Sequence, residues 1–281
     1  MSYLDRIRAC NAGDLSRYRP LIVAGHDVGR IAPEIANRLA DFPTIFNVGV
    51  DVVELNPALA TVEDRTAAVA VVSRKFYEQG IFTEWWDEQY PIATSFGAPL
   101  LLTVERGCVP CYGFIAYGVH INGIVRDGGE TRMWIARRSR GKRSHPGLLD
   151  QIVAGGQPAG LTLVENVIKE CAEEAAIPAG LARCAQSVGT ITYTGERLEG
   201  LRNDVLFNYD LELPADFTPF AADGEVEEFY LWNLAEVAER ICETEDFKFN
   251  CNLVIIDFLI RHGFIPADHP DYVAISRGLH A

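Results

Sequence analysis

Residues 154–177, AGGQPAGLTLVENVIKECAEEAAI, indicate the fold most directly. Gly155, Gly156 and Gly160 precede a helical pattern that continues to Pro178. Apolar residues recur in this pattern at spacings of three and four, which places them on one face of a helix; they are Val164, Val167, Ile168, Cys171, Ala172 and Ala175. The stretch therefore predicts a glycine-rich loop that leads directly into an amphipathic helix.

Three carboxylates, Glu170, Glu173 and Glu174, lie off this apolar face and close to one another. Like charges at helical spacing destabilise a helix by about 0.2–0.5 kcal/mol for each pair. Lys169 is the only cation in the pattern, so most of the repulsion has no local partner. A hard divalent cation such as Mg²⁺ binds carboxylate and carbonyl oxygens, and it would remove the repulsion between these glutamates. A solvated acidic helix end is the alternative that the carboxylates alone leave open.

The order of these residues resembles the Nudix box, the loop and helix signature of hydrolases that cleave a diphosphate linked to a further group. Gly155 and Gly160 match its glycines, and residues 169–177, KECAEEAAI, match its second half. Lys169 stands where the signature has arginine. Lysine keeps the positive charge of arginine but cannot donate two parallel hydrogen bonds to one carboxylate. Leu161 and Ala176 replace a glutamate and a glycine. Glu165, one helical turn after Leu161, is a candidate to supply the missing carboxylate.

The resemblance implies Mg²⁺ or Mn²⁺ as cofactor. Glu173 and Glu174 would be the principal ligands, with the carbonyl of Ala154 as a further oxygen donor. Glu170 would be a ligand or would orient the attacking water, and Lys169 would orient the glutamates. Related enzymes add a late acidic residue, for which Glu225, Glu227 and Glu228 are all candidates. The residues we expect in catalysis are Glu170, Glu173, Glu225 and Glu228.

A cluster of cations precedes the glycine loop in a chain that is otherwise acidic. It consists of Arg137, Arg138, Arg140, Lys142 and Arg143. A guanidinium group can donate two parallel hydrogen bonds to the oxygens of one phosphate, so this segment is expected to face a diphosphate. The expected substrate-binding residues are Arg137, Arg138, Lys142, Gly155 and Gly156. The alternative is a solvated loop that balances nearby glutamates.

Composition limits the classes of partner. The chain has 281 residues, is 48% hydrophobic and carries a net charge of −14, which argues against a nucleic-acid surface. The first ten residues, MSYLDRIRAC, lack an apolar leader segment, and the apolar run 67–72 is too short to cross a membrane. We therefore expect a soluble cytoplasmic protein that binds a small-molecule diphosphate but neither nucleic acid nor membrane. The oligomeric state is left open.

The cysteines predict reduced thiols. Their number, seven, is odd and does not resemble a disulfide framework. Cys108 and Cys111 have the spacing of a redox pair or half a zinc site, but a zinc site needs two further ligands, and the sequence has no second such pair.

Two domains are expected: an N-terminal α+β domain over residues 1–111, and a Nudix-type α/β/α sandwich with a mixed sheet over residues 112–281. The turn Asp127-Gly128-Gly129-Glu130 predicts a hairpin between strands 118–126 and 131–139. Further expected strands are 21–23, 46–55, 99–106, 186–194, 205–213 and 226–232, and expected helices include 62–78, 234–241 and 252–262. Trp85, Trp86 and Tyr90 are candidates to stack on the organic half of a substrate, or to be core residues.

The resemblance extends to a particular Nudix subfamily related to thiamine pyrophosphokinase-like proteins. It rests on residues 74–80 (RKFYEQG), 134–139 (WIARRS), 145–156 (HPGLLDQIVAGG), 223–229 (DGEVEEF) and 258–263 (FLIRHG). It implies hydrolysis of a diphosphate bond in a thiamine diphosphate-like substrate, with nucleotide-type diphosphates next. A catalytically weak ligand-binding or sensing protein and an isomerase with a catalytic cysteine are the alternatives.

Overall fold

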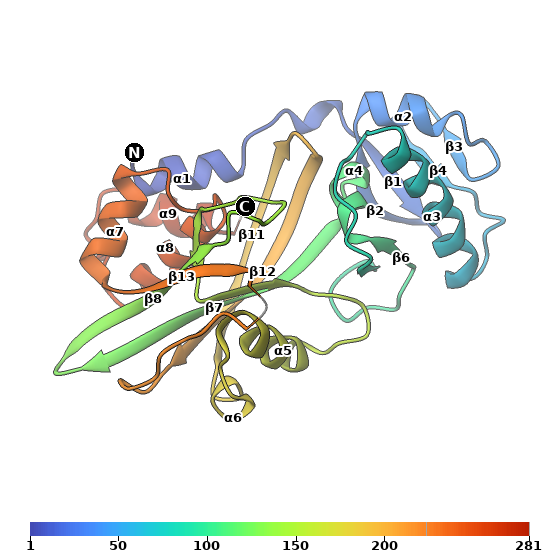
Figure 1. The fold of residues 1–281 in the computed structure, drawn as a ribbon. Coiled ribbons are helices and arrows are strands. Elements are labelled where there is room, and N and C mark those ends of the chain that lie inside the picture. Colours follow the sequence, from blue (N-terminus) through green and yellow to red (C-terminus); the bar gives the residue numbers. More distant parts are fainter. Residues whose placement is uncertain (223, 281) are drawn as a thin grey trace.

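The computed structural model describes residues 1–222 and 224–280, and it confirms a mixed α and β organisation (Figure 1). Asp223, the first residue of the DGEVEEF segment, lies outside the described residues. A smaller N-terminal unit with its own four-stranded sheet stands beside a larger unit built on a seven-stranded sheet. Each unit has a buried apolar core of its own.

The N-terminal unit holds a four-stranded sheet in the order β2-β1-β4-β3, packed with α2 and α3. The bounds are η1 (Leu15–Arg17), β1 (Arg19–Val23), β2 (His26–Ile31), α2 (Pro33–Leu39), β3 (Phe46–Val48), β4 (Val53–Leu55) and α3 (Val62–Glu78). Helix α3 begins and ends where the sequence predicted. The single strand expected over residues 46–55 was wrong: the chain turns between Gly49 and Val52, whose backbones share a 2.8 Å hydrogen bond, and forms two antiparallel strands.

A short hairpin and a short helix connect this unit to the large sheet. They are β5 (Gln89–Ile92), β6 (Leu102–Glu105), η2 (Arg106–Cys108) and α4 (Val109–Tyr112). Cys108 and Cys111 are buried here in the N-terminal core, and the thiols are free. Packing therefore accounts for this cysteine pair.

The large sheet runs in the order β11-β12-β7-β8-β13, with β10 paired to β7 and β9 paired to β8. Its strands are β7 (Ile115–Asp127), β8 (Glu130–Arg138), β9 (Leu149–Gln151), β10 (Val153–Gly156), β11 (Gln186–Arg197), β12 (Gly200–Glu212) and β13 (Val226–Asn233). The predicted hairpin is confirmed, because β7 and β8 pair up to Asp127 and Glu130. Strands β12 and β7 are parallel and the other pairs antiparallel, so the sheet is mixed as expected.

Helices cover both faces of this sheet (Figure 1). Helix α5 (Leu163–Ala175), followed by α6 (Ala179–Ala182), lies on one face. Helices α1 (Tyr3–Cys10), α7 (Leu234–Glu243), α8 (Cys251–Arg261) and α9 (Tyr272–Gly278) lie on the other. On α5, Val167, Cys171 and Ala175 are buried as predicted, whereas Val164 and Ala172 are exposed.

The first helix packs with the C-terminal helices rather than with the N-terminal unit. Ile7 and Cys10 are buried in the core that α8 and α9 share. The guanidinium of Arg6 donates a 2.7 Å hydrogen bond to the Ile241 carbonyl at the end of α7. The chain thus begins on the large unit, passes through the small one and returns. The domain boundary near residue 112 stays a prediction.

Candidate functional site

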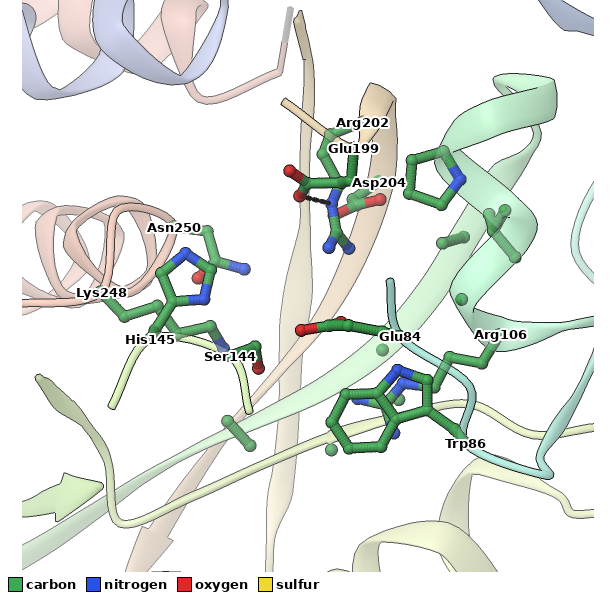
Figure 2. Close-up of a pocket in the computed structure, with 18 of the residues that line it drawn as sticks. Glu84, Trp86, Arg106, Ser144, His145, Glu199, Arg202, Asp204, Lys248 and Asn250 are labelled. Carbon is green, nitrogen blue, oxygen red and sulfur yellow. Dashed lines mark hydrogen bonds and ion pairs between the residues drawn. The ribbon is translucent and has the colours of Figure 1, made fainter. Parts of the chain in front are cut away.

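A cavity of about 520 Å³ lies where the two units meet, and residues of both units line it (Figure 2). Strand β10 contributes Ala154, Gly155 and Gly156, and α5 contributes Glu170 and Glu174. The N-terminal unit contributes Glu84, Trp86, Tyr90 and Arg106, among others. The cavity is the size of a site for a small organic ligand.

Glycine at position 155 allows Glu170 to lie against the backbone of β10. A Cβ atom at Gly155 would be 2.2 Å from the Glu170 Cδ. Glu170 is only 9% exposed, and burial raises its pKa, which the neighbouring Lys169 opposes. A buried carboxylate with a raised pKa at the wall of a cavity is suited to bind a cation or to accept a proton from water.

Glu174 is held between the backbone of β10 and a lysine. The Ala154 N–H donates a 2.8 Å hydrogen bond to its Oε2, and the Lys142 ammonium lies 3.9 Å from its Oε1. Burial raises the pKa of Glu174 to about 8, while Lys142 lowers it. Lys142 also bonds the carboxylate of Glu225. The structure thus brings Ala154, Glu174, Glu225 and Lys142 together, as the sequence predicted for one site.

Lys169 bridges the other two glutamates of α5. Its Nζ lies 3.0 Å from Glu170 Oε1 and 2.8 Å from Glu173 Oε2. Glu173 is half exposed and does not line the cavity, unlike Glu170 and Glu174. The Lys169 ammonium thus lies between the two carboxylates, and its orienting role stays a prediction.

The carboxylate missing at Leu161 is not replaced by Glu165. The Thr162 N–H and hydroxyl donate to Glu165 Oε2 at 2.9 and 2.7 Å, which forms a capping box at the start of α5. These bonds lower the pKa of Glu165. Glu165 therefore stabilises the helix terminus and does not line the cavity.

The predicted cation cluster divides between two faces, because successive residues of a strand point to opposite sides. Arg137 donates to the Tyr230 hydroxyl at 3.0 Å, and that hydroxyl donates to Glu228 at 2.5 Å. Arg137 and Glu228 lie outside the cavity lining. Arg138 does line it, but its guanidinium bonds Asp150 at 2.9 Å and the Ser144 carbonyl. Among these cations, Lys142 alone reaches the carboxylates of the site.

Two sets of side chains could hold a metal ion. His120, Asp150 and Cys251 are buried, and their ligand atoms lie within 4.8 Å of one another. Asp150, however, already bonds Arg138 at 2.9 Å and lies 3.5 Å from Lys248, and these two cations hold its pKa far below its usual range although burial opposes them. A divalent cation there would meet two positive charges. Oxygen donors from Glu170, Glu174 and Ala154 fit Mg²⁺ or Mn²⁺ better, because hard cations prefer oxygen ligands.

The N-terminal unit brings to the cavity two of the aromatic candidates, Trp86 and Tyr90, together with Arg106, which the sequence did not single out. The Arg106 guanidinium carbon lies 4.6 Å from the Trp86 ring centre and 5.7 Å from that of Tyr90. Arg106 also pairs with Glu88 at 2.9 Å. Of the two roles that the sequence left open for Trp85, the structure shows the core one, because its ring packs on Tyr77 and Phe82 in the N-terminal core. The arginine is separated from the glycine loop by some fifty residues, so no local motif includes it.

The opposite wall of the cavity comes from the C-terminal half of the chain (Figure 2). Arg202 donates a 3.0 Å hydrogen bond to Glu199, and its guanidinium points into the cavity. The hydroxyl of Tyr193 bonds Asp204, and Asn250 bonds the same hydroxyl at 3.3 Å. This wall is polar, which suits a ligand whose organic half carries heteroatoms.

Two family models match the chain, one for each part of it. Residues 2–116 match the family model described as Domain of unknown function (DUF4743), and residues 116–251 match that of the NUDIX domain. Nudix hydrolase 20, chloroplastic, from Arabidopsis thaliana is 41% identical over 99% of this chain and 77% of its own length. Nudix hydrolase 24, chloroplastic, from the same plant shows 41% identity over the same shares. The NUDIX domain of Shewanella oneidensis NrtR, solved with ADP-ribose, is 16% identical, with a TM-score of 0.41 over 52% of this chain and 87% of that chain.

These relatives correct the predicted cytoplasmic location, since both Arabidopsis proteins are chloroplastic. Transit peptides are amphipathic and rich in serine and arginine, so the hydropathy argument does not apply to them. In the part of the chain that the structure describes, no helix has the length and apolar character needed to cross a membrane.

The family assignment rests on identity along almost the whole chain and on a site with the expected residues. Glu170 and Glu174 meet the glycine strand in one cavity, as the signature in residues 154–177 implies. The Arabidopsis relatives share 41% of their residues with this chain over most of their length. The chain therefore belongs to the Nudix hydrolases and is a pyrophosphate-bond hydrolase.

Proposed function

We propose that this protein is a Mg²⁺- or Mn²⁺-dependent diphosphatase that acts on a thiamine diphosphate-like substrate, and that it belongs to the Nudix subfamily related to thiamine pyrophosphokinase-like proteins. One observation carries the proposal: two buried carboxylates, a glycine backbone and a lysine line the same cavity. Nucleotide-type diphosphates are the next class of substrate.

The residues divide into metal-holding and phosphate-holding groups. Glu170, Glu174 and the Ala154 carbonyl would hold the ion. Glu173 joins this set on the resemblance alone, because it pairs with Lys169 outside the cavity lining. When bound, the ion neutralises charge on the phosphoryl oxygens and lowers the pKa of water. The glycines at 155 and 156 have no side chains, so a diphosphate can approach the backbone there.

Lys142 is the cation best placed for the phosphate end. Its ammonium already lies beside Glu174 and Glu225, and its side chain is 13% exposed at the cavity wall. Glu225 is the late acidic residue that the structure favours, since Glu228 bonds Tyr230 outside the cavity. Glu170, at the cavity wall, would also orient the water that the ion activates.

The test is phosphate release from a panel with Mg²⁺ or Mn²⁺, measured directly or after phosphatase treatment. The panel holds thiamine diphosphate, its oxidised analogues, ADP-ribose and nucleoside diphosphates. Glu174→Gln keeps the shape of the side chain and removes its charge. Glu63→Gln is the matched control, because Glu63 is exposed in the first turn of α3.

We expect release from a thiamine-type compound, its loss in Glu174→Gln and its retention in Glu63→Gln. Phosphate release from the nucleotides alone would show that the substrate is a nucleotide-type diphosphate. No release from any compound by folded, metal-loaded protein would contradict the proposal and favour a binding or sensing role.

A further inference from the structure

We propose that Glu84 determines substrate specificity by binding a positive charge or an N–H donor on the organic half of the diphosphate. The inference rests on the proposed function and names the class of substrate more closely. Glu84 belongs to the N-terminal unit, in the segment between α3 and β5, and it lines the cavity. Figure 2 shows its carboxylate reaching into the cavity, with the Trp86 indole on one side and the Arg202 guanidinium on the other.

Glu84 differs from the other carboxylates of the cavity in having no partner among the described residues. Glu170 bonds Lys169, Glu174 bonds the Ala154 N–H, and Glu225 bonds Lys142. On the opposite wall, Glu199 pairs with Arg202 and Asp204 with the Tyr193 hydroxyl. A polar group at a cavity wall that the protein leaves without a partner is available to a ligand.

The backbone around Glu84 is fixed in place. A Cβ atom at Gly107 would be 2.0 Å from the Glu84 carbonyl oxygen, so only glycine allows this contact. The Trp86 N–H donates a 2.7 Å hydrogen bond to the buried carboxylate of Glu105. Arg143, from the loop after β8, donates to the Trp85 carbonyl at 2.8 Å. Glu84 is therefore presented by a segment that contacts both units, which is the preorganisation that selective binding requires.

The neighbouring cations do not neutralise this carboxylate. Arg106 pairs with Glu88 and lies over the Trp86 ring, and Arg202 pairs with Glu199. Lys142 and Lys248 pair with carboxylates of the large unit. The cavity thus presents one negative group that repels a second anionic group on the substrate. It favours an organic half with a cationic ring or an amino group.

The Glu84 carboxylate also gives the N-terminal unit a role in the proposed function. A metal ion and phosphate-binding groups on the large unit recognise any diphosphate. Groups elsewhere in the cavity must therefore distinguish one organic half from another. A charge-assisted hydrogen bond discriminates strongly, because a substrate without the matching donor leaves the carboxylate unpaired. Glu84 is placed to supply that discrimination.

The experiment compares wild-type protein, Glu84→Gln and the surface control Glu63→Gln on two substrates. Thiamine diphosphate has a cationic, amino-bearing organic half, and isopentenyl diphosphate has an apolar one. Calorimetric binding of thiamine, which carries no phosphate, gives a readout that is independent of hydrolysis. Mg²⁺ affinity is measured for each variant.

We expect Glu84→Gln to lower the ratio of kcat/KM for thiamine diphosphate to that for isopentenyl diphosphate by roughly tenfold or more, through KM, and to weaken thiamine binding to the same extent. Mg²⁺ affinity should not change, and Glu63→Gln should behave as wild type. An unchanged ratio with unchanged thiamine binding would overturn the inference, and so would the lack of thiamine binding by wild type. Thiamine binding that depends on Glu84 without any hydrolysis would support it while contradicting the proposed function.

Discussion

The hydroxyl of Tyr90 lies directly against Gly156, so that a Cβ atom at position 156 would be 1.5 Å from it. Tyr90 belongs to β5 of the N-terminal unit and Gly156 to β10 of the large unit. Burial raises the pKa of Tyr90 to about 12, so its hydroxyl keeps its proton at neutral pH. The glycine at 156 is therefore needed for the contact between the units as well as for access of a substrate.

Gly156→Ala should destabilise the protein by about 1–3 kcal/mol, because the added methyl group overlaps the tyrosine. Tyr90→Phe in the same chain should restore part of this loss, since it removes the nearest atom and leaves the ring carbon at 2.7 Å. Thermal unfolding measures both effects. Gly180→Ala is the control: no atom lies within 4 Å of a Cβ there, and the substitution should not destabilise the protein. Equal unfolding temperatures for Gly156→Ala and wild type would contradict the contact.

Lys142→Met should tighten Mg²⁺ binding by roughly fivefold, because it removes a positive charge that lies 3.9 Å from Glu174. The same substitution should raise KM for a diphosphate, since the phosphate end loses its cation. Isothermal titration with Mg²⁺ and steady-state kinetics separate the two effects. Lys75→Met, on the exposed face of α3, is the control. Weaker Mg²⁺ binding in Lys142→Met would show that the lysine does not compete with the ion.

The sequence predicted the parts of the site that depend on local spacing. Glu170 and Glu174 are one helical turn apart, so any helix over these residues brings the two carboxylates close together. The hairpin at Asp127 and Glu130 follows in the same way from adjacent turn residues.

The other features of the site depend on contacts between residues that are far apart in the sequence or that compete for the same partner. Arg137 and Arg138 look equivalent in the sequence, yet Arg137 bonds the Tyr230 hydroxyl and Arg138 bonds the Asp150 carboxylate. Glu165 looked like a spare carboxylate, but the Thr162 N–H and hydroxyl were closer partners. Glu84 enters the cavity only because the N-terminal unit folds against the large sheet, which no local pattern encodes.

Asp210→Asn should lower stability by about 3 kcal/mol at neutral pH, because it breaks a largely buried ion pair. Asp210 accepts bonds from Arg261 at 2.7 and 3.1 Å, from His262 at 3.0 Å and from Asn122 at 3.0 Å. Burial alone would raise its pKa, but these bonds outweigh burial and lower it. Asp216→Asn is an exposed control.

The lowered pKa of Asp210 sets the pH dependence of this effect. The ionised form is favoured in the folded state, so its stabilisation is fully present above the unfolded aspartate pKa of about 3.9 and is lost as pH falls through the lower folded value. Urea unfolding of wild type and Asp210→Asn should therefore show a difference that shrinks as the pH falls below about 4. A difference that grows as the pH falls below about 4 would have the wrong sign.

Ala176→Gly should stabilise the protein by up to about 1 kcal/mol, because Ala176 ends α5 with a φ of 51°, in the left-handed region. A residue with a Cβ is strained there by about 1–2 kcal/mol, while glycine adds about 0.4–1 kcal/mol of unfolded-state entropy, so the net gain is small and positive. Ala172→Gly, at an exposed interior position of the same helix, should instead destabilise by about 0.5–1 kcal/mol. Denaturant unfolding of the two variants compares the same chemical change in two backbone conformations. Equal destabilisation by both would show that the left-handed conformation at the end of α5 carries no strain.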